Sequence, residues 1–505
     1  MSDVIDRRDL DFLLYDCLDL EELTGHDYFA AHDREGFDVI IDTAIRIARE
    51  KFEPHAAKLD EQPPSFDGER VHIIPEVQEA VDAFNEAGFL RASFAQDVGG
   101  MQLPYSVTQA FMAVFYAANC STAAYPLLTI AAANLLATYG NDSQQERFLE
   151  PMLSGRFTGT MCLSEPQAGS SLSDIETTAE PIEGEDGRYK IRGNKMWISA
   201  GDHELSDTIV HLVLAKIPGG PPGVKGISLF IVPKHRLDEN GDPAEPNDVA
   251  LAGLNHKMGY RGAINTVLNF GENDDCVGWL VGEPHRGLTY MFHMMNEARI
   301  GVGLGATMLG HAGYLHSLDY ARERPQGRLP DEKDPEEPPV AIIEHADVRR
   351  MLLAQKSYVE GALMLCLMCA RLVDDITVAR DEGDEETADQ TEMLLELLTP
   401  IAKAWPSEFC LEANKLAIQV MGGYGYTSEY PVERYYRDNR LNAIHEGTNG
   451  IQAIDLLGRK VTMEHGAALR LLVGRIQETV ADAREHGQLG GYADALEDAV
   501  ERATA

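Results

Sequence analysis

Positive charge is scarce in this 505-residue chain, in which 43 Lys and Arg residues face 82 Asp and Glu residues. The formal net charge is −39. Proteins that bind nucleic acid concentrate Lys and Arg on one surface, because phosphate contacts dominate their affinity. The deficit therefore excludes nucleic acid as a partner. We interpret the acidic excess as a solvated shell that favours solubility, with adaptation to salt as the alternative.

Long apolar runs are also missing. No run of eighteen or more apolar residues without charge occurs, so we expect no membrane span. The first residues, "MSDVIDRRDLDFLLYDCLDLEEL", carry acids throughout and lack the basic and apolar regions of a secretory signal. We therefore expect a cytoplasmic protein.

Several catalytic signatures are absent. The sequence contains no G-x-S-x-G elbow, no H-E-x-x-H and no P-loop. "GVGLGA" at 301–306 matches a dinucleotide fingerprint, but a helical segment precedes it, so we interpret it as close helix packing. His445 and Glu446 are adjacent and would not share a helix face, which argues against a metal pair. We predict no metal site.

Cysteine is present in an odd number, seven, and in no disulfide framework. The single C-x-x-C, Cys366 to Cys369, lies in an apolar helical stretch without a second Cys or His pair. This pattern predicts reduced core cysteines rather than a zinc or redox site.

Periodicity divides the chain into four parts and predicts an α+β fold. Residues 1–157 have mainly helical spacing, and residues 158–280 contain short β-branched and aromatic runs separated by Gly, Pro and Asn. Helical spacing returns over 281–461, interrupted by the acidic, Pro-rich loop "RERPQGRLPDEKDPEEPP". Residues 462–505 form a helical tail. This order predicts segregated layers rather than alternating βαβ units.

Three segments have a composition suited to binding a cofactor or a substrate. "TMCLSEPQAGSSLSD" at 160–174 places small residues in a bend that can direct N–H groups at an anion or ring, or is a plain turn. "KMWIS" puts Trp197 on a strand. Its indole is either part of the hydrophobic core or a flat surface against which a planar cofactor lies. In "QVMGGYGYTSEY", two glycines allow close backbone approach.

The fourth segment, "AIHEGTNGIQAIDLLGRK" at 443–460, places Glu446 before a glycine turn. The carboxylate is either a helix cap or a general base. An unperturbed glutamate has a pKa near ~4.3, and burial would raise it toward the range a base needs. We expect Ile444 and the apolar helix after Gly450 to provide those surroundings.

Together these segments resemble the acyl-CoA dehydrogenase family from about residue 35 to 460. Two motifs, "MCLSEPQAGSS" and "KMWISAG", resemble the loop and the strand that contact the flavin in this family. Two more, "RERPQG" and "QVMGGYGYTSEYPVERYYRD", resemble the segments that reach the FAD of a neighbouring subunit. The last, "HEGTNGIQ", resembles the catalytic turn of the family. The resemblance implies an N-terminal helical domain, a middle β-barrel-like domain and a C-terminal four-helix bundle. "NHKMGYRGAINTVLNFGE" and the long acidic loop look like the longer branch, which includes 3-methylmercaptopropionyl-CoA dehydrogenases. Members of that branch usually carry a further helical C-terminal domain, so the resemblance implies that the tail at 462–505 is a shortened form of it.

The resemblance makes Glu446 the base that removes the α-hydrogen of an acyl thioester. Some members place the base before an arginine on an earlier helix, where this chain has Ala298, which cannot act as a base. The backbone N–H of Glu446 and a ribityl hydroxyl of the flavin would hold the thioester oxygen. Arg299 would lie near the thioester, or pair with Glu297 or another acid.

The resemblance also assigns binding residues. Those expected to bind FAD are Met161, Leu163, Ser164, Ser170, Trp197, Ser199, Arg324, Gln326, His345, Gln419, Gly422, Gly423, Thr448 and Gly450. Those expected to bind substrate are Ser170, Asn296, Arg299, His445 and Gly447. Two departures leave substrate size and pH optimum open: His445 replaces a frequent tyrosine, and "RPQGR" replaces Arg-x-Gln-Phe-Gly.

The implied function is FAD-dependent oxidation of an acyl-CoA to a trans-2-enoyl-CoA by a homodimer or homotetramer, with an electron-transfer flavoprotein as acceptor. The expected substrate is 3-methylmercaptopropionyl-CoA, an intermediate of DMSP demethylation. The alternatives are a short- or medium-chain fatty acyl-CoA dehydrogenase, an acyl-CoA oxidase, and a non-catalytic flavin-binding relative.

Overall fold

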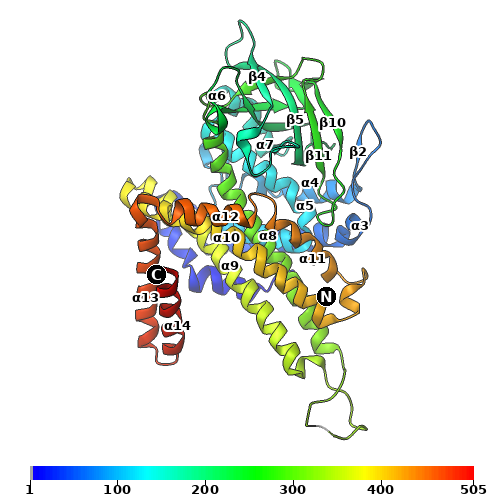
Figure 1. The fold of residues 1–505 in the computed structure, drawn as a ribbon, viewed down its shortest axis with the longest axis vertical. Helices are drawn as coiled ribbons and strands as arrows, with labels where there is room; N and C mark the ends of the chain where they lie inside the picture. Colours follow the sequence, from blue (N-terminus) through cyan, green and yellow to red (C-terminus); the bar gives the residue numbers. More distant parts are fainter. Residues whose placement is uncertain (1–3, 332, 505) are drawn as a thin grey trace.

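The computed structural model describes residues 4–331 and 333–504, except for the side chains at 293, 294 and 296. An N-terminal helical layer, a β unit and a set of long helices follow one another along the chain (Figure 1). The β unit lies at one end of the molecule, and the long helices extend away from it. The predicted α+β class is confirmed, and helices and strands occupy separate layers.

The N-terminal layer surrounds an apolar helical segment, α5 (Tyr105–Tyr139), which is kinked at Asn119 and contains no charged residue. By length and composition α5 is able to cross a membrane, but 72% of its most apolar window is buried inside the fold. A buried core helix needs no polar face, which explains the composition. The other main helices of this layer are α1 (Arg7–Asp11), α2 (Arg34–Ile47), α3 (Ala56–Glu61), α4 (Pro75–Glu86), α6 (Asp142–Gln144) and α7 (Glu150–Leu153).

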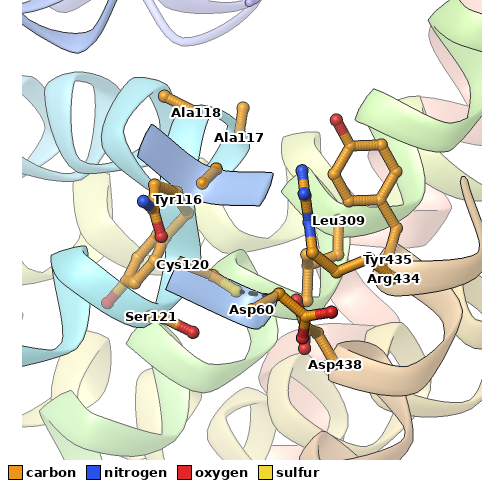
Figure 2. Close-up of a pocket in the computed structure, with 12 residues that line it drawn as sticks. Asp60, Tyr116, Ala117, Ala118, Cys120, Ser121, Leu309, Arg434, Tyr435 and Asp438 are labelled. Carbon is orange, nitrogen blue, oxygen red and sulfur yellow. Dashed lines mark hydrogen bonds between the residues drawn. The ribbon is translucent and has the colours of Figure 1, made fainter. Parts of the chain in front are cut away.

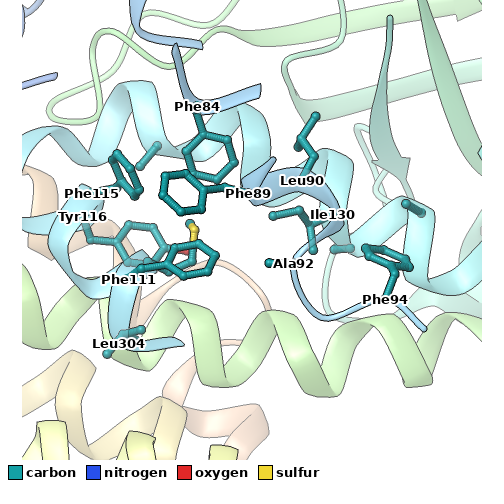
Figure 3. Close-up of a cluster of buried hydrophobic side chains, with 14 of the residues drawn as sticks. Phe84, Phe89, Leu90, Ala92, Phe94, Phe111, Phe115, Tyr116, Ile130 and Leu304 are labelled. Carbon is teal, nitrogen blue, oxygen red and sulfur yellow. The ribbon is translucent and has the colours of Figure 1, made fainter. Parts of the chain in front are cut away.

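Helix α5 carries an aromatic cluster against α4 and the turn that follows it (Figure 3). The Phe89 ring lies 4.6 Å from Phe111 and 5.2 Å from Phe84, centroid to centroid, and Phe84 lies 5.0 Å from Phe115. All four side chains are at most 3% exposed. Contacts at these separations add to the hydrophobic stabilisation of the core.

The β unit is an eight-stranded sheet in the order β10-β11-β5-β12-β7-β6-β3, and β4 pairs with both β5 and β6. The strands from β5 through β12, β7 and β6 back to β4 therefore close a ring, in agreement with the predicted barrel-like domain. The strands are β3 (Phe157–Cys162), β4 (Thr178–Pro181), β5 (Arg188–Ser199), β6 (Thr208–Lys216), β7 (Ile227–Pro233), β10 (Val249–Leu254), β11 (Asn265–Phe270) and β12 (Val277–Leu280). Two two-stranded sheets complete the set: β1 (Ser65–Phe66) with β2 (Val71–His72), and β8 (His235–Leu237) with β9 (Pro243–Pro246).

Three long helices form the C-terminal unit: α8 (Gly287–Glu323), α9 (Ala346–Asp381) and α10 (Glu385–Met421). The "GVGLGA" segment lies inside α8 and serves close packing, as predicted. A Cβ atom on Gly303 would lie 1.9 Å from the Ala402 carbonyl oxygen of α10. Two short helices, α11 (Val432–Asn439) and α12 (Asn449–Asp455), complete the unit, and a hairpin of α13 (Ala467–Glu485) and α14 (Gly490–Thr504) projects beside it (Figure 1).

A buried ion pair joins the 160–174 segment to strand β5. Lys195 Nζ lies 2.9 Å from Glu165 Oε1 and 3.0 Å from the Leu163 carbonyl oxygen, and both charged side chains are at most 2% exposed. Glu165 also accepts hydrogen bonds from Thr177, through its backbone N–H (3.1 Å) and its hydroxyl (2.6 Å). Burial opposes ionisation of Glu165, but Lys195 and these donors outweigh it and lower its pKa.

We predict that Lys195→Met destabilises the β unit by about 3–5 kcal/mol, because it leaves the Glu165 carboxylate buried without its counter-ion. The midpoint of thermal unfolding, followed by circular dichroism, checks the loss. Lys190→Met is the matched control, since Lys190 lies on the same strand and its ion pair with Asp274 is exposed to solvent. An equal fall of the midpoint in both variants would contradict the assignment.

Candidate active site

The turn that carries Glu446 is held in a left-handed backbone conformation, with φ of +50° at Glu446 and +84° at Gly447. This region is uncommon for a residue with a side chain and marks local strain. Gln452, 1% exposed in α12, donates from Nε2 to the carbonyl oxygens of Glu446 (3.1 Å) and Gly447 (3.2 Å). The Thr448 hydroxyl accepts a backbone N–H at the start of α12. These bonds hold the backbone of the Glu446 turn against α12.

Two cations lie close to Glu446, each supplied by a different long helix. Arg299 of α8 is 4% exposed and pairs with Asp455, Nη1 to Oδ2 3.0 Å, rather than with Glu297. Lys403 of α10 is fully buried, and its Nζ lies 3.4 Å from Asn449 Oδ1. Among the described residues, no carboxylate oxygen lies within 4.0 Å of Lys403 Nζ.

The protein around the Glu446 carboxyl raises its pKa by burial, while Lys403 and Arg299 offset part of that rise. Burial acts oppositely on Lys403 and lowers its pKa to about 8, against the attraction of Glu446. A raised carboxyl pKa is what a general base for a weakly acidic C–H bond requires. The electrostatics of this turn therefore suit proton abstraction better than helix capping, which Thr448 performs instead.

Sequence reasoning missed three contributors to this arrangement, Lys403, Asp455 and Gln452. One signal was available for Lys403, a lone lysine in the apolar helical stretch "LLTPIAKAWP". A lysine with no helical charge partner in a buried helix needs a tertiary one.

The expected source of burial for Glu446 was wrong. Ile444 is 49% exposed, and Ile454 and Leu457 of the following helical segment are 68% and 69% exposed. These side chains face away from the base. The surroundings of Glu446 come from the long helices that carry Arg299 and Lys403.

His445 ends a chain of buried side-chain amides. Asn414 Nδ2 donates to the Leu309 carbonyl oxygen (2.8 Å), Asn439 Nδ2 to Asn414 Oδ1 (2.7 Å), and Asn442 Nδ2 to Asn439 Oδ1 (3.0 Å). Because a carbonyl oxygen only accepts, the direction of every bond in the chain is fixed. Asn442 Oδ1 is therefore an acceptor, and His445 Nε2, 3.0 Å away, donates to it.

This direction sets the protonation state of His445. The imidazole carries its hydrogen on Nε2, and burial, with a contribution from Lys403, lowers its pKa to about 3. His445 is therefore neutral at physiological pH and adds no charge beside Glu446.

The first group of predicted cofactor residues lies together in the β unit. Met161 is the penultimate residue of strand β3, and the backbone N–H of Met196 donates to the Ser164 carbonyl oxygen (3.0 Å), which ties the loop to β5. Trp197 is the extra residue of a bulge opposite β11, with φ of +67° and an indole 57% exposed. Leu163, Ser170 and Ser199 complete the group.

The second group lies at the far end of α8, around an open cavity of about 640 Å³. Arg324 lies over the Tyr424 ring, 5.4 Å from its centroid, and His345 Nε2 contacts the Gln326 carbonyl oxygen (2.7 Å). A Cβ atom on Gly422 or Gly423 would meet nothing within 4 Å, so the glycines leave space for a ligand. The predicted residues that line this cavity are Arg324, Gln326, His345, Gly422 and Gly423.

Helix α8 separates the two groups. It has 37 residues, which corresponds to about 55 Å at 1.5 Å per residue. Its first residue packs on β7 of the β unit, and its last precedes the cavity (Figure 1). One chain therefore does not bring all the predicted cofactor residues together.

Three predicted residues lie elsewhere. Gln419 is exposed on α10 and does not line the cavity, and Gly450 is exposed in the first turn of α12. The side chain of Asn296 lies outside the described residues.

A separate polar pocket lies between α5, α8 and α11 (Figure 2). It has about 10 Å³ of free volume, the space of one water molecule. Cys120 Sγ lies 3.5 Å from Asp438 Oδ2, and burial raises the pKa of Asp438 to about 6. None of the predicted site residues lines this pocket, and it is too small for an acyl group.

The cysteines and the other possible metal ligands lie scattered through the described part of the chain. No group of three or more His, Cys, Asp or Glu side chains is arranged to hold a metal there. All seven cysteines are free, and Cys366 and Cys369 are buried in α9. The C-x-x-C motif is therefore part of the helical core, as predicted.

Three family models match the chain in order. The acyl-CoA dehydrogenase N-terminal domain matches residues 35–156, the middle domain 160–272 and the C-terminal domain 285–461. Together they cover the helical layer, the β unit and the three long helices.

Characterised relatives agree with the models. The chain is 39% identical to 3-methylmercaptopropionyl-CoA dehydrogenase of Ruegeria pomeroyi, over 82% of this chain and 69% of the relative. It is 35% identical to a butyryl-CoA dehydrogenase of Syntrophomonas wolfei and 34% identical to a broad-specificity linear acyl-CoA dehydrogenase of Mycobacterium tuberculosis, in each case over 95% of this chain and 79% of the relative.

Solved structures share the fold. Butyryl-CoA dehydrogenase of Megasphaera elsdenii superposes with a TM-score of 0.67 at 22% identity, over 84% of this chain and 97% of that one. ACDH-11 of Caenorhabditis elegans, solved with C11-CoA, superposes with a TM-score of 0.78 at 18% identity, over 97% of this chain and 80% of that one. The domain order, the relatives and the fold agree: the chain belongs to the acyl-CoA dehydrogenase family of flavin-dependent oxidoreductases.

Proposed function

We propose that this protein binds FAD and oxidises an acyl-CoA thioester to a trans-2-enoyl-CoA, with Glu446 as the general base. The observation that carries the proposal is the strained, fixed Glu446 turn beside two buried cations. The Glu446 carboxylate takes the α-hydrogen as a proton, and a C=C bond forms as the β-hydrogen leaves with its electron pair. FAD, when bound, supplies the acceptor for that hydride.

The backbone supports the developing charge on the thioester. The N–H of Glu446 makes no hydrogen bond within the described residues, so it is free to donate to a thioester oxygen. A fixed donor aimed at an oxygen that becomes an enolate stabilises the transition state more than the ground state. Gly447 keeps this backbone open to the substrate, and Arg299 and His445 line the approach in our proposal.

The residues present suit FAD. The exposed Trp197 indole on its bulge offers a flat apolar wall, with the Ser199 hydroxyl beside it. The loop from Met161 to Ser170 offers backbone donors at the same edge. The glycine-lined cavity with Arg324 suits the phosphates and adenine, for which a guanidinium is a favourable partner. We also include Gln419, Thr448 and Gly450 among the residues proposed to bind FAD.

The separation of the two groups supports a homodimer. In a symmetric pair, the cavity of one subunit would complete the cofactor site that begins on the β unit of its partner. A homotetramer is the second form compatible with this arrangement. We propose an electron-transfer flavoprotein as the electron acceptor.

For the substrate we propose 3-methylmercaptopropionyl-CoA, on the basis of the relative from Ruegeria pomeroyi. The butyryl-CoA and linear acyl-CoA dehydrogenases among the relatives support a short- or medium-chain fatty acyl-CoA as the alternative. An acyl-CoA oxidase and a non-catalytic flavin-binding protein differ from both in measurable outcomes.

We predict that Glu446→Gln lowers kcat by about 10²–10⁴-fold, because the amide cannot accept the α-proton. Stopped-flow bleaching of the flavin absorbance measures the step. The matched control is Glu412→Gln, an exposed glutamate of α10 that pairs with Lys415. Unchanged turnover of Glu446→Gln with every acyl-CoA tested would refute the proposed mechanism.

Anaerobic titration with a panel of acyl-CoAs identifies the substrate. We expect the highest kcat/KM with 3-methylmercaptopropionyl-CoA and the next highest with butyryl-CoA. A higher value for a straight-chain acyl-CoA would move the protein to fatty acid oxidation. Hydrogen peroxide formed without a dye acceptor would identify an oxidase, and no bleaching by any acyl-CoA would favour the non-catalytic protein.

Subunit mixing tests the shared cofactor site. Homodimers of Glu446→Gln and of Arg324→Glu are each expected to be inactive, the second through loss of FAD. In mixed dimers one site combines an intact Glu446 with an intact Arg324, so we expect recovery of about half the wild-type activity per dimer. No recovery in dimers shown by tandem tags to be mixed would place each site within one chain.

A further inference from the structure

Lys403 is a buried cation without an ion-pair partner among the described residues. Its side chain is fully buried, and within the described part of the chain its one polar contact is Asn449 Oδ1 at 3.4 Å. Arg299, the other cation of the site, differs because Asp455 neutralises it at 3.0 Å. A buried, unpaired ammonium is costly, so its presence here requires a compensating interaction.

The backbone of α10 holds Lys403 in place. Pro400 and Pro406 flank it within the helix, and each removes a backbone N–H that would hydrogen-bond four residues back. The Ala402 carbonyl freed by Pro406 is covered by Gly303 of α8, where a Cβ atom would lie 1.9 Å away. The two helices are therefore in backbone contact directly beside Lys403, which restricts movement of the lysine.

The lysine points at the catalytic turn rather than at solvent. Asn449 is the first residue of α12 and lies three positions after Glu446. Asn449 Nδ2 in turn lies 3.3 Å from Glu408 Oε2 of α10, so the asparagine is held from both sides by that helix. The contacts of Asn449 join the Glu446 turn to α10.

We propose that Lys403 is the positioning residue of the base: its ammonium keeps the partly buried Glu446 carboxylate ionised, and through Asn449 it fixes the turn to α10. This inference rests on the proposed role of Glu446. The mutual electrostatic effects support it, because Lys403 lowers the pKa of Glu446 and Glu446 raises that of Lys403.

The charged and titratable groups around Lys403 determine the sign of the effect. They are Glu446 and His445 on the turn, Arg299 on α8, Asp455 on α12 and Glu408 on α10. Cys366 of α9 lies beside the neighbouring residue, with its Sγ 4.0 Å from the Ala402 carbonyl oxygen. His445 is neutral, and Asp455 is engaged by Arg299. Burial raises the pKa of Glu446, and the charge of Lys403 counteracts that effect. Removal of the Lys403 charge is therefore expected to raise the pKa of Glu446 further.

The pH dependence of kcat/KM tests the proposal. The base must be ionised to act, so a higher pKa moves the acid limb of the profile to higher pH. We expect Lys403→Met to shift that limb upward by about one unit or more, the effect of an opposite charge within ~4–6 Å. Lys403→Arg, which keeps the charge, is expected to restore the wild-type limb. Lys415→Met, an exposed lysine on the same helix, is the matched control and leaves the profile unchanged.

A second variant covers the case in which Lys403→Met does not fold. Asn449→Asp keeps the lysine but supplies a carboxylate that engages its ammonium, so it is also expected to move the acid limb upward. Infrared titration of the Glu446 carboxyl band, assigned by its loss in Glu446→Gln, measures the same pKa without turnover. Coincident profiles and bands in the wild type, Lys403→Met and Asn449→Asp would overturn the role of Lys403. Full activity of Glu446→Gln would instead refute the proposed base.

Discussion

Helices α8 and α10 touch at Gly303 and Ala402, and the geometry of the site depends on that contact. Any side chain at Gly303 would separate the helices and with them the two cations they carry. Because the contact is between backbones, Arg299 and Lys403 approach the Glu446 turn from two rigid elements. A rigid support of this kind preorganises charge, so that little reorganisation is needed when the proton moves.

In the β unit, too, a buried charged pair holds a proposed binding segment in place. The buried Glu165–Lys195 ion pair ties a glycine- and serine-rich loop to the strand that carries Trp197. Left alone, such a loop would sample many conformations, and ordering it would oppose ligand binding entropically. The ion pair orders the loop during folding. The proposed flavin wall and the proposed base are therefore held by two independent buried charge systems in two separate units.

Local pattern was sufficient for much of the fold. The change from helical to strand periodicity identified the β unit, and the glycines of "GVGLGA" were recognised as packing residues because no strand precedes them. Local pattern failed to predict burial where the surroundings of a residue come from elements distant in the sequence. Ile454 and Leu457 have core-like spacing and yet are exposed. Periodicity reports which residues share a face of a helix, and does not report what covers that face.

The sequence by itself determined the family, the order of the three units and the position of the acid before a glycine turn, because these depend on residue type and spacing along the chain. Only the tertiary structure decided that Arg299 pairs with Asp455, that Lys403 lies beneath the turn, and that His445 is neutral with its hydrogen on Nε2. The cofactor residues also divide into two groups only in three dimensions. The physical reason is common to all four cases: burial and Coulomb interactions depend on distance in space, which separation along the chain does not specify.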